Sequence, residues 1–294
     1  MKLSTTSNLT LGFNQLDPHA NLPLHNFSKS VFQISSTPLP VEQFFDAANC
    51  YRWLRANFPA SIILSIFYIV AIFVFQDLMK TKPPIKPKIP LFLWNLSLAL
   101  FSILGTYRLL PWAIKEWRTY GFHRIVCKAR IDDPMEALWV FFFTISKVVE
   151  FGDTVFLILR KRPVIFLHWY HHAATLVFAW FTVISDAAVL RIFSLMNLVV
   201  HAVMYSYFAI SALSFRFPRA LSMAITALQI LQMILGLIIT AFATYYKATK
   251  GCDFPPSGPW LALLMYGSYL VLFARFFKES YGKREAKEVE RKKL

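Results

Sequence analysis

Long apolar stretches, separated by short polar segments, recur along this chain and predict membrane-spanning helices. The sequence contains seven such stretches, at residues 59–78, 91–114, 135–159, 164–184, 188–213, 221–246 and 260–277. Lipid offers no hydrogen-bond partner to the backbone, and no alternating ten-residue pattern repeats along the chain, so helices are favoured over a β-barrel. The predicted fold class is therefore an all-α integral membrane protein with seven transmembrane helices.

The segments outside these stretches divide the chain into three predicted parts. Residues 1–40 are rich in Ser, Thr, Asn and Pro without periodicity, which is typical of a disordered segment. Residues 41–58 carry aromatic and aliphatic side chains at helical spacing, which predicts one amphipathic helix in the membrane interface. The predicted domains are thus a disordered N-terminus, a seven-span domain over 41–277 and a basic tail over 278–294.

Composition and charge agree with a membrane protein and give its topology. Hydrophobic residues make up 56% of the chain and the formal net charge is +15, with a mean hydropathy of +0.48. The basic residues lie between spans and at the C-terminus, so they indicate topology signals and lipid contacts rather than nucleic-acid binding. Placing the C-terminus in the cytosol puts 17 Lys and Arg residues on that side against 12 on the other. The N-terminus is therefore expected on the lumenal side.

This topology places all three cysteines, Cys50, Cys127 and Cys252, on the non-cytosolic side. That compartment permits disulfides. Cys127 falls between the second and third spans and Cys252 between the sixth and seventh, so a bridge between these two loops is a candidate. The sequence alone does not fix the pairing.

Polar side chains follow one face of four consecutive spans. The turn at 160–163 is so short that the third and fourth spans must be antiparallel neighbours, with Asp153 and His168 at similar depth. Ionisable groups in hydrocarbon are costly, which makes function the default explanation; interhelical hydrogen bonding is the alternative, above all for Thr226 and Gln229. The stripes comprise Lys147, Glu150, Asp153 and Thr154, then His168, His171 and His172, then Asn197, His201 and Tyr205, then Thr226, Gln229 and Gln232.

Two kinds of chemistry fit clustered imidazoles. Membrane di-iron desaturases and hydroxylases use His-x-x-His-His boxes, but they need about eight nitrogen ligands. This chain has seven histidines, and His19, His25 and His123 lie outside the predicted membrane cluster. A di-iron centre is therefore disfavoured, and a single zinc has no specific support. Acyl transfer from a thioester fits better, because an imidazole can attack the thioester and pass the acyl group on.

Four motifs make the chain resemble the fatty-acid elongases of the endoplasmic reticulum, the condensing enzymes of very-long-chain fatty acid synthesis. Residues 147–154 are similar to the family's Lys-x-x-Glu-x-x-Asp-Thr motif, and residues 167–172 to its histidine box. Residues 201–208 resemble His-x-x-Met-Tyr-x-Tyr-Tyr, with Phe208 replacing the last Tyr. Residues 226–232 resemble Thr-x-x-Gln-x-x-Gln. The resemblance covers approximately residues 53–277.

The resemblance implies that the chain condenses a long-chain acyl-CoA with malonyl-CoA to give 3-oxoacyl-CoA, carbon dioxide and CoA. It implies no metal or redox cofactor and a location in the endoplasmic reticulum membrane. Candidate partners are the reductases and the dehydratase of the elongation cycle and a second copy of the chain. The Trp169-Tyr170 pair, and Pro163 where the polyunsaturated branch tends to have Gln, favour saturated, monounsaturated or methyl-branched acyl chains.

The predicted mechanism is ping-pong. His171 attacks the acyl thioester, and His201 stabilises the oxyanion or enolate. Asp153 orients His168, and His172 completes the network. Six helices surround a closed acyl tunnel, whose end toward the lumen sets product length. The residues expected to bind substrate are Lys147, Glu150, Thr154, Asn197, Tyr205, Gln229, Gln232, Arg160 and Lys161, with Lys147, Arg160, Lys161 and Arg162 as candidate contacts for CoA.

Three alternatives remain at this point. His171 could act as a general base in a one-step ternary reaction without an acyl-enzyme. A metal-dependent hydroxylase or desaturase predicts bound iron. A non-catalytic lipid transporter predicts that His171→Ala preserves function.

Overall fold

The computed structural model describes residues 39–128 and 133–282, and every regular element within these ranges is helical. The expectations for residues 1–38 and for most of the basic tail lie outside the described residues. The helices are α2 (Pro40–Gln43), α3 (Ala47–Ala56), α4 (Phe58–Met79), α5 (Lys88–Cys127), α6 (Pro134–Val149), α7 (Gly152–Leu159), α8 (Phe166–Ile184), α9 (Val189–Ala212), α10 (Arg219–Thr249), α11 (Gly258–Phe277) and the π-helical η1 (Lys278–Gly282).

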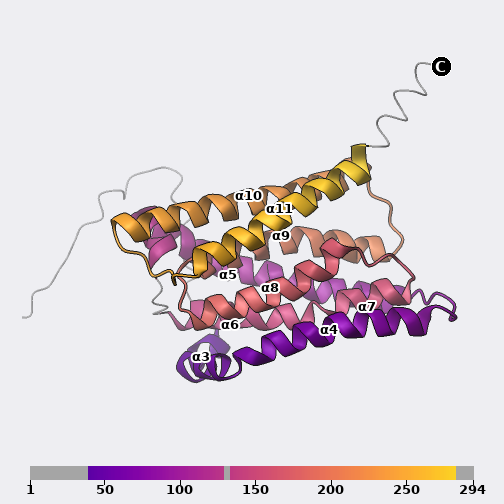
Figure 1. Cartoon of the computed structure of the whole chain (residues 1–294), viewed down its shortest axis with the longest axis horizontal. Coiled ribbons are helices and arrows are strands. Elements are labelled where there is room, and N and C mark those ends of the chain that lie inside the picture. Colours follow the sequence, from indigo (N-terminus) through magenta and orange to yellow (C-terminus); the bar gives the residue numbers. More distant parts are fainter. Residues whose placement is uncertain (1–38, 129–132, 283–294) are drawn as a thin grey trace, which may run out of the picture. The chain divides into compact units, whose positions relative to one another are not determined.

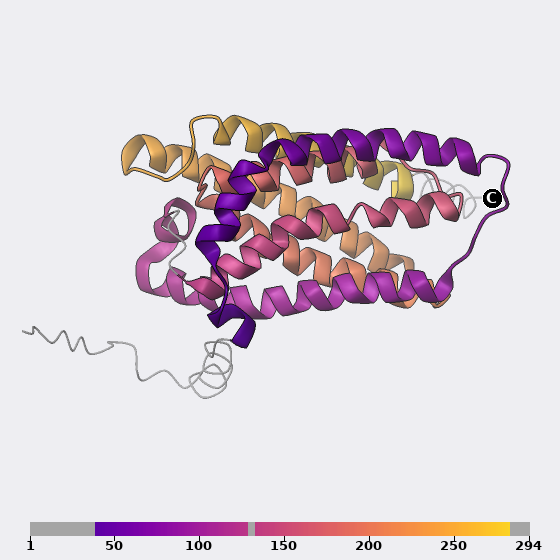
Figure 2. The same cartoon turned by 90° about the horizontal axis from the view of Figure 1, so that it is seen from below.

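The long helices lie side by side in one bundle (Figures 1 and 2). The most extensive pairing joins α5 to α9, followed by α10 with α11 and α4 with α8. Helix α8 also packs against α6 and α11, so it lies inside the bundle, and the three histidines of residues 167–172 lie on this helix. The chain thus places the helix with three histidines where other helices can supply hydrogen-bond partners.

Among the described residues, five helices are long and apolar enough to cross a membrane: α4, α5, α9, α10 and α11 with η1. They coincide with five of the seven predicted spans. The other two predicted spans correspond to α6 with α7, which are only 16 and 8 residues long, and to α8, whose three imidazole side chains lower its mean hydropathy. The chain is therefore a multi-pass, all-helical membrane protein.

The predicted third span, 135–159, is not one continuous helix. It is divided between α6 and α7, with Glu150 and Phe151 between them. The amide of Asp153 donates to the carbonyl of Glu150 at 3.1 Å, and that of Thr154 to Phe151 at 3.2 Å. These bonds span three residues instead of four and tighten the turn, which stacks residues three apart on one face. Glu150 and Asp153 therefore project from the same side of this turn.

Packing explains the glycine beside this break. A Cβ atom at Gly152 would lie 2.3 Å from the indole ring of Trp94 on α5. Only a residue without a side chain allows α5 and α7 to approach this closely. The glycine therefore serves the contact that brings Trp94 to the polar stripe.

The predicted interfacial helix over 41–58 is wrong in its continuity. The chain forms α2 and α3 instead, and the side chain of Asp46 accepts a hydrogen bond from the amide of Asn49 at the start of α3. The break turns Glu42 inward, where its carboxylate pairs with Arg108 of α5 at 2.6 Å. Both side chains are at most 3% exposed. Glu42 was expected on a polar surface, but it anchors α2 to the bundle.

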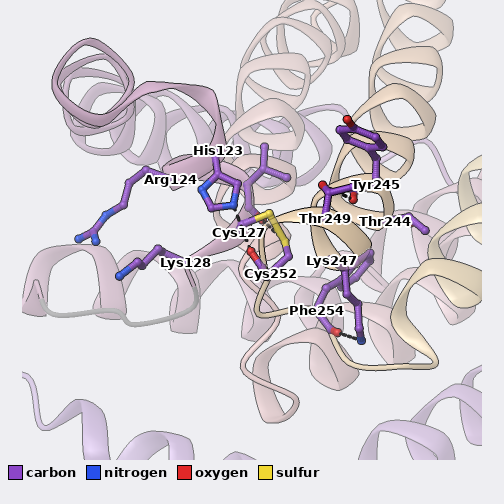
Figure 3. Close-up of a disulfide and its surroundings, with 12 residues drawn as sticks. His123, Arg124, Cys127, Lys128, Thr244, Tyr245, Lys247, Thr249, Cys252 and Phe254 are labelled. Atoms are coloured by element: carbon purple, nitrogen blue, oxygen red, sulfur yellow. Dashed lines mark hydrogen bonds between the residues drawn. A yellow bond between two sulfur atoms is a disulfide. The ribbon is translucent and has the colours of Figure 1, made fainter.

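Helix α5 continues beyond the predicted span end at residue 114 and carries Cys127 into contact with the segment after α10. Cys127 and Cys252 form a disulfide, with 4.4 Å between their Cα atoms (Figure 3). This is the pairing suggested by the predicted topology. A kink at Gly121, whose φ is 78°, re-aims the last turns of α5. His123 beside the disulfide reaches the carbonyl of Gly251 at 3.1 Å. The disulfide thus ties α5 to the connection between α10 and α11.

Candidate active site

The polar stripes of four helices meet at a cavity of about 500 Å³ in the bundle. Its wall includes all four histidines of the predicted membrane cluster, His168, His171, His172 and His201. Further lining residues come from α5, α7, α10, α11 and η1. The structure therefore brings together side chains that are up to 190 residues apart in the sequence.

A second, smaller cavity of about 40 Å³ adjoins the first. It is mostly apolar and is lined by aromatic side chains such as Phe178, Phe193 and Tyr266. These residues lie toward the helix ends that carry the disulfide, whereas the large cavity extends toward Arg160 and Tyr281 at the opposite ends. Four residues line both cavities: His171, Asn197, Gln232 and Met233. They mark the junction between the two spaces.

His171 differs from the other three histidines because it alone among them lines both cavities. Its backbone carbonyl accepts a hydrogen bond from the Tyr269 hydroxyl at 3.0 Å, and the two rings lie 4.9 Å apart between centroids. Within the described part of the chain, the ring nitrogens of His171 and His172 make no hydrogen bond, whereas those of His168 and His201 do. His171 therefore combines an unpaired ring with a position at the cavity junction.

His201 belongs to a closed ring of four polar side chains. Lys147 Nζ donates to Glu150 Oε1 at 2.7 Å and to Asn197 Oδ1 at 2.8 Å. Because the oxygen of the Asn197 amide must face the ammonium, its nitrogen faces His201 Nε2 at 3.1 Å. His201 Nδ1 lies 3.6 Å from Glu150 Oε1. Hence Nε2 is the hydrogen-bond acceptor, and the proton is on Nδ1.

This tautomer changes the role expected of His201. As an oxyanion donor it would need a ring N–H group that is free to reach the substrate. Here Nε2 accepts a hydrogen bond from Asn197 and Nδ1 faces Glu150, so neither ring nitrogen offers a free N–H group. Asn197, predicted only to bind substrate, supplies the N–H group.

Asp153 does not orient His168, contrary to the sequence prediction. Its carboxylate accepts hydrogen bonds from Trp94 Nε1 and from the Tyr205 hydroxyl, each at 2.7 Å. The nearest imidazole is that of His172, at 4.0 Å. Depth matching placed Asp153 and His168 together, but the tight turn after Glu150 brings the next residue, Thr154, to the histidine.

His168 is held through a hydroxyl pair. Its Nε2 lies 2.9 Å from Thr154 Oγ1, which in turn lies 2.7 Å from the hydroxyl of Tyr68 on α4. Tyr68 stacks on Phe151 with a centroid distance of 4.0 Å. Tyr68 and Trp94 were not predicted as site residues, because each is an ordinary aromatic residue in an apolar span. Only the packing shows that their polar atoms point to the stripe.

The remaining predicted residues divide between the cavity and other positions. Lys147 is wrong as a contact for CoA, because its side chain is 2% exposed and pairs with Glu150. Arg160 lines the large cavity. Lys161 lies on the exposed turn, where its Nζ donates to the carbonyl of Lys80 at 3.0 Å. Gln229, which contacts the sulfur of Met204, and Phe208 both line the large cavity.

The family comparison decides the identity of this arrangement. Residues 53–289 match the model of the ELO family, described as GNS1/SUR4. The chain belongs to this family. It is 41% identical over 259 residues to very long chain fatty acid elongase 6 of Drosophila melanogaster, covering 84% of this chain and 82% of the relative. The prediction of an elongase, with its condensing activity, is confirmed.

Two mammalian relatives extend this result to nearly full-length proteins. Very long chain fatty acid elongase 3 of Mus musculus is 38% identical over 257 residues, which cover 87% of this chain and 94% of the relative. Very long chain fatty acid elongase 6 of Homo sapiens is 37% identical over 241 residues, which cover 82% of this chain and 91% of the relative. The similarity includes all helices that line the two cavities, so the ELO family assignment applies to the whole candidate site.

Proposed function

We propose that this ELO-family protein joins a long-chain acyl-CoA and malonyl-CoA through an acyl-imidazole on His171. The supporting observation is the state of that side chain: its ring has no hydrogen-bond partner among the described residues and lines both cavities. His171 is therefore the imidazole best prepared to attack a carbonyl at the junction. The proposed reaction uses no metal or redox cofactor.

The two cavities suggest where each part of the acyl-CoA lies. The small apolar space marks where the acyl chain would begin, although at about 40 Å³ it must widen to hold a long chain; the large space, which extends toward Arg160, suits CoA and then malonyl-CoA. With this division the thioester carbon lies at the junction beside His171. The lining residues come from α5 through α11, and none comes from α4. This distribution supports a tunnel enclosed by six of seven spans.

We further propose that α6 with α7, and α8, complete seven crossings of the endoplasmic reticulum membrane. With an odd number of crossings the termini lie on opposite sides. The disulfide belongs on the lumenal side, where oxidation is permitted, which leaves the basic C-terminus in the cytosol. The cycle's reductases and dehydratase, which act on the product, and a second copy of the chain are the proposed protein partners.

The acyl substrates that we propose are saturated, monounsaturated or methyl-branched. Pro163 precedes α8, and the Trp169-Tyr170 pair lies within its first turns. The Tyr170 hydroxyl pairs with Ser268 of α11 at 3.0 Å, which fixes α8 against α11 beside His171. A ladder of acyl-CoA lengths in a malonyl-CoA incorporation assay would test this choice.

Acyl-CoA alone tests the ping-pong proposal. The purified protein, incubated without malonyl-CoA, is expected to release one equivalent of free CoA and to gain the acyl mass on the peptide that contains His171. The acyl group must leave the thioester before the second substrate binds if the enzyme itself carries it. CoA release that requires malonyl-CoA, with no acyl mass, would instead support the one-step reaction in which His171 is a base.

Arg160→Ala is expected to weaken CoA binding without slowing chemistry. Arg160 is the predicted cationic contact that lines the cavity, and guanidinium groups bind phosphate in a two-point geometry. We expect the KM values for both CoA substrates to rise about 10-fold, equivalent to one charge-assisted hydrogen bond, with kcat within about two-fold. The control is Lys82→Ala, which removes an exposed charge from the linker between α4 and α5. Equal KM effects in the two variants would contradict a specific role for Arg160.

A further inference from the structure

Gln232 on α10 has a carboxamide with no protein partner. The residue is 6% exposed, and within residues 39–128 and 133–282 its side chain makes no hydrogen bond. It lines both cavities at their junction, beside His171. Its amide atoms are not fully enclosed by protein, so the cavity supplies their hydrogen-bond partner, either water or a bound ligand.

We propose that Gln232 donates a hydrogen bond to the oxyanion formed at the acyl carbonyl, with Asn197 as the second donor. This inference rests on the proposed function, in which the thioester carbon lies at the junction. Gln232 on α10 and Asn197 on α9 both line the two cavities, so each carboxamide lies close to that point. Two preorganised N–H groups aimed at one developing charge are the arrangement that acyl transfer requires.

The polar ring prepares Asn197 for this role. Lys147 Nζ donates to Asn197 Oδ1, so the amide cannot turn its oxygen toward the cavity. Asn197 Nδ2 uses one hydrogen for His201 Nε2 at 3.1 Å and has a second hydrogen left. The ammonium also polarises the amide, because it withdraws electron density from the group that donates. The buried Lys147–Glu150 pair is thus assigned to positioning.

Other side chains near the junction are committed elsewhere. The Tyr269 hydroxyl already donates to the backbone carbonyl of His171. Gln229 Nε2 lies 3.2 Å from the sulfur of Met204 and does not reach the small cavity. The two ring nitrogens of His201 lie against Asn197 and Glu150. Gln232 is therefore the available donor for charge that develops at the junction.

The oxyanion forms twice in the reaction. A lone pair of His171 attacks the thioester carbon, and the carbonyl π electrons move to oxygen. Collapse breaks the C–S bond, and the thiolate of CoA takes the proton that the imidazolium loses. Malonyl-CoA then loses carbon dioxide, and its enolate carbon attacks the acyl-imidazole. The second oxyanion collapses to 3-oxoacyl-CoA as the C–N bond breaks, and the departing imidazolate of His171 takes a proton from solvent. Gln232 would donate to the same oxygen in both steps.

Gln232→Met tests this assignment, because methionine has a similar shape and no N–H donor. With both substrates present, kcat is expected to fall about 10²- to 10³-fold, the usual cost of one oxyanion donor. Binding of an alkyl-CoA thioether of the same chain length, which lacks the carbonyl oxygen, is expected to change by less than about two-fold. Gln232→Asn, which keeps the amide on a shorter arm, is expected to retain intermediate activity.

Thr240→Val is the matched control, because it removes a buried hydroxyl from the same helix at a position that lines neither cavity. Its kcat is expected to stay within about two-fold. A Gln232→Met kcat within five-fold of the unaltered protein, or equal losses of thioether binding and kcat, would overturn the proposal. Failure of the ping-pong mechanism is separate: it appears as absent CoA release without malonyl-CoA, whereas a one-step condensation still forms an oxyanion at the acyl carbonyl.

Discussion

His171→Ala is expected to abolish condensation, with kcat reduced by at least about 10³-fold, because the nucleophile that carries the acyl group is lost. The side chain lines the junction of the two cavities, and its backbone carbonyl is fixed by Tyr269. Alanine leaves this backbone contact in place. The variant should therefore fold and bind acyl-CoA while releasing no CoA in the absence of malonyl-CoA.

The matched control for this variant is His123→Asn, which alters a histidine beside the disulfide, outside both cavities. Its activity is expected to stay within about two-fold of the unaltered protein. Intact-mass spectrometry after incubation with acyl-CoA should show the acyl adduct in the control and none in His171→Ala. An adduct that persists in His171→Ala would move the acyl group to another histidine, and retained condensation would favour a non-catalytic role for the cluster.

The sequence predicted the composition of the site well, but not its internal contacts. Spacing placed His168, His171 and His172 on one helix face, because residues three and four apart share a face, and the polar stripe of the next span added His201. Matching depths across the turn at 160–163 failed for Asp153, because it assumed a regular helix through Glu150. A turn with three-residue hydrogen bonds shifts the register enough to exchange Asp153 for Thr154 beside His168.

The hydrogen bonds of two aromatic residues could not be predicted from the hydropathy pattern either. Trp94 and Tyr68 add to the apolar character of their spans, so their sequences indicate only membrane helices. Their N–H and O–H groups nevertheless hold Asp153 and Thr154. The amphipathic nature of these side chains allows one face to pack while the polar atom bonds inward. Which rotamer does so depends on the packing of α4 and α5 against α7, and one sequence contains no signal for it.

In the fold as well, the sequence pattern predicts where the long helices lie, whereas tertiary contacts decide where a helix breaks. Hydropathy located all the long helices, since about 20 apolar residues are needed to cross a bilayer. It did not detect that the helix expected at 41–58 breaks, because a glutamate such as Glu42 is typical of the polar face of an amphipathic helix. A buried arginine in α5 provides the missing partner. This residue, Arg108, lies in a predicted apolar span and was not singled out from the sequence.

Arg108→Met is expected to lower the free energy of unfolding by about 3–5 kcal/mol, because it leaves the Glu42 carboxylate buried without its charged partner. Glu42 accepts hydrogen bonds from Arg108 Nε at 2.8 Å, from Arg108 Nη2 at 2.6 Å and from Trp139 Nε1 at 2.9 Å. The tryptophan bond and a bond from the Leu39 amide to Glu42 Oε2, at 2.7 Å, survive the change, but both donors are neutral. Thermal unfolding in detergent should show a fall in Tm on the order of 10 °C.

Restoring neutrality separates the charge from the packing. The double variant Glu42→Gln/Arg108→Met removes both charges and is expected to regain most of the lost stability, since a buried pair contributes less than one stranded charge costs. The control is Arg55→Met, which breaks the Arg55–Asp186 pair; its side chains are 61% and 71% exposed, so a change below about 1 kcal/mol is expected. Equal losses for Arg108→Met and Arg55→Met would mean that α2 is not anchored by this pair. Because Glu42 and Arg108 line neither cavity, kcat measured well below the unfolding transition should stay within about two-fold in the double variant.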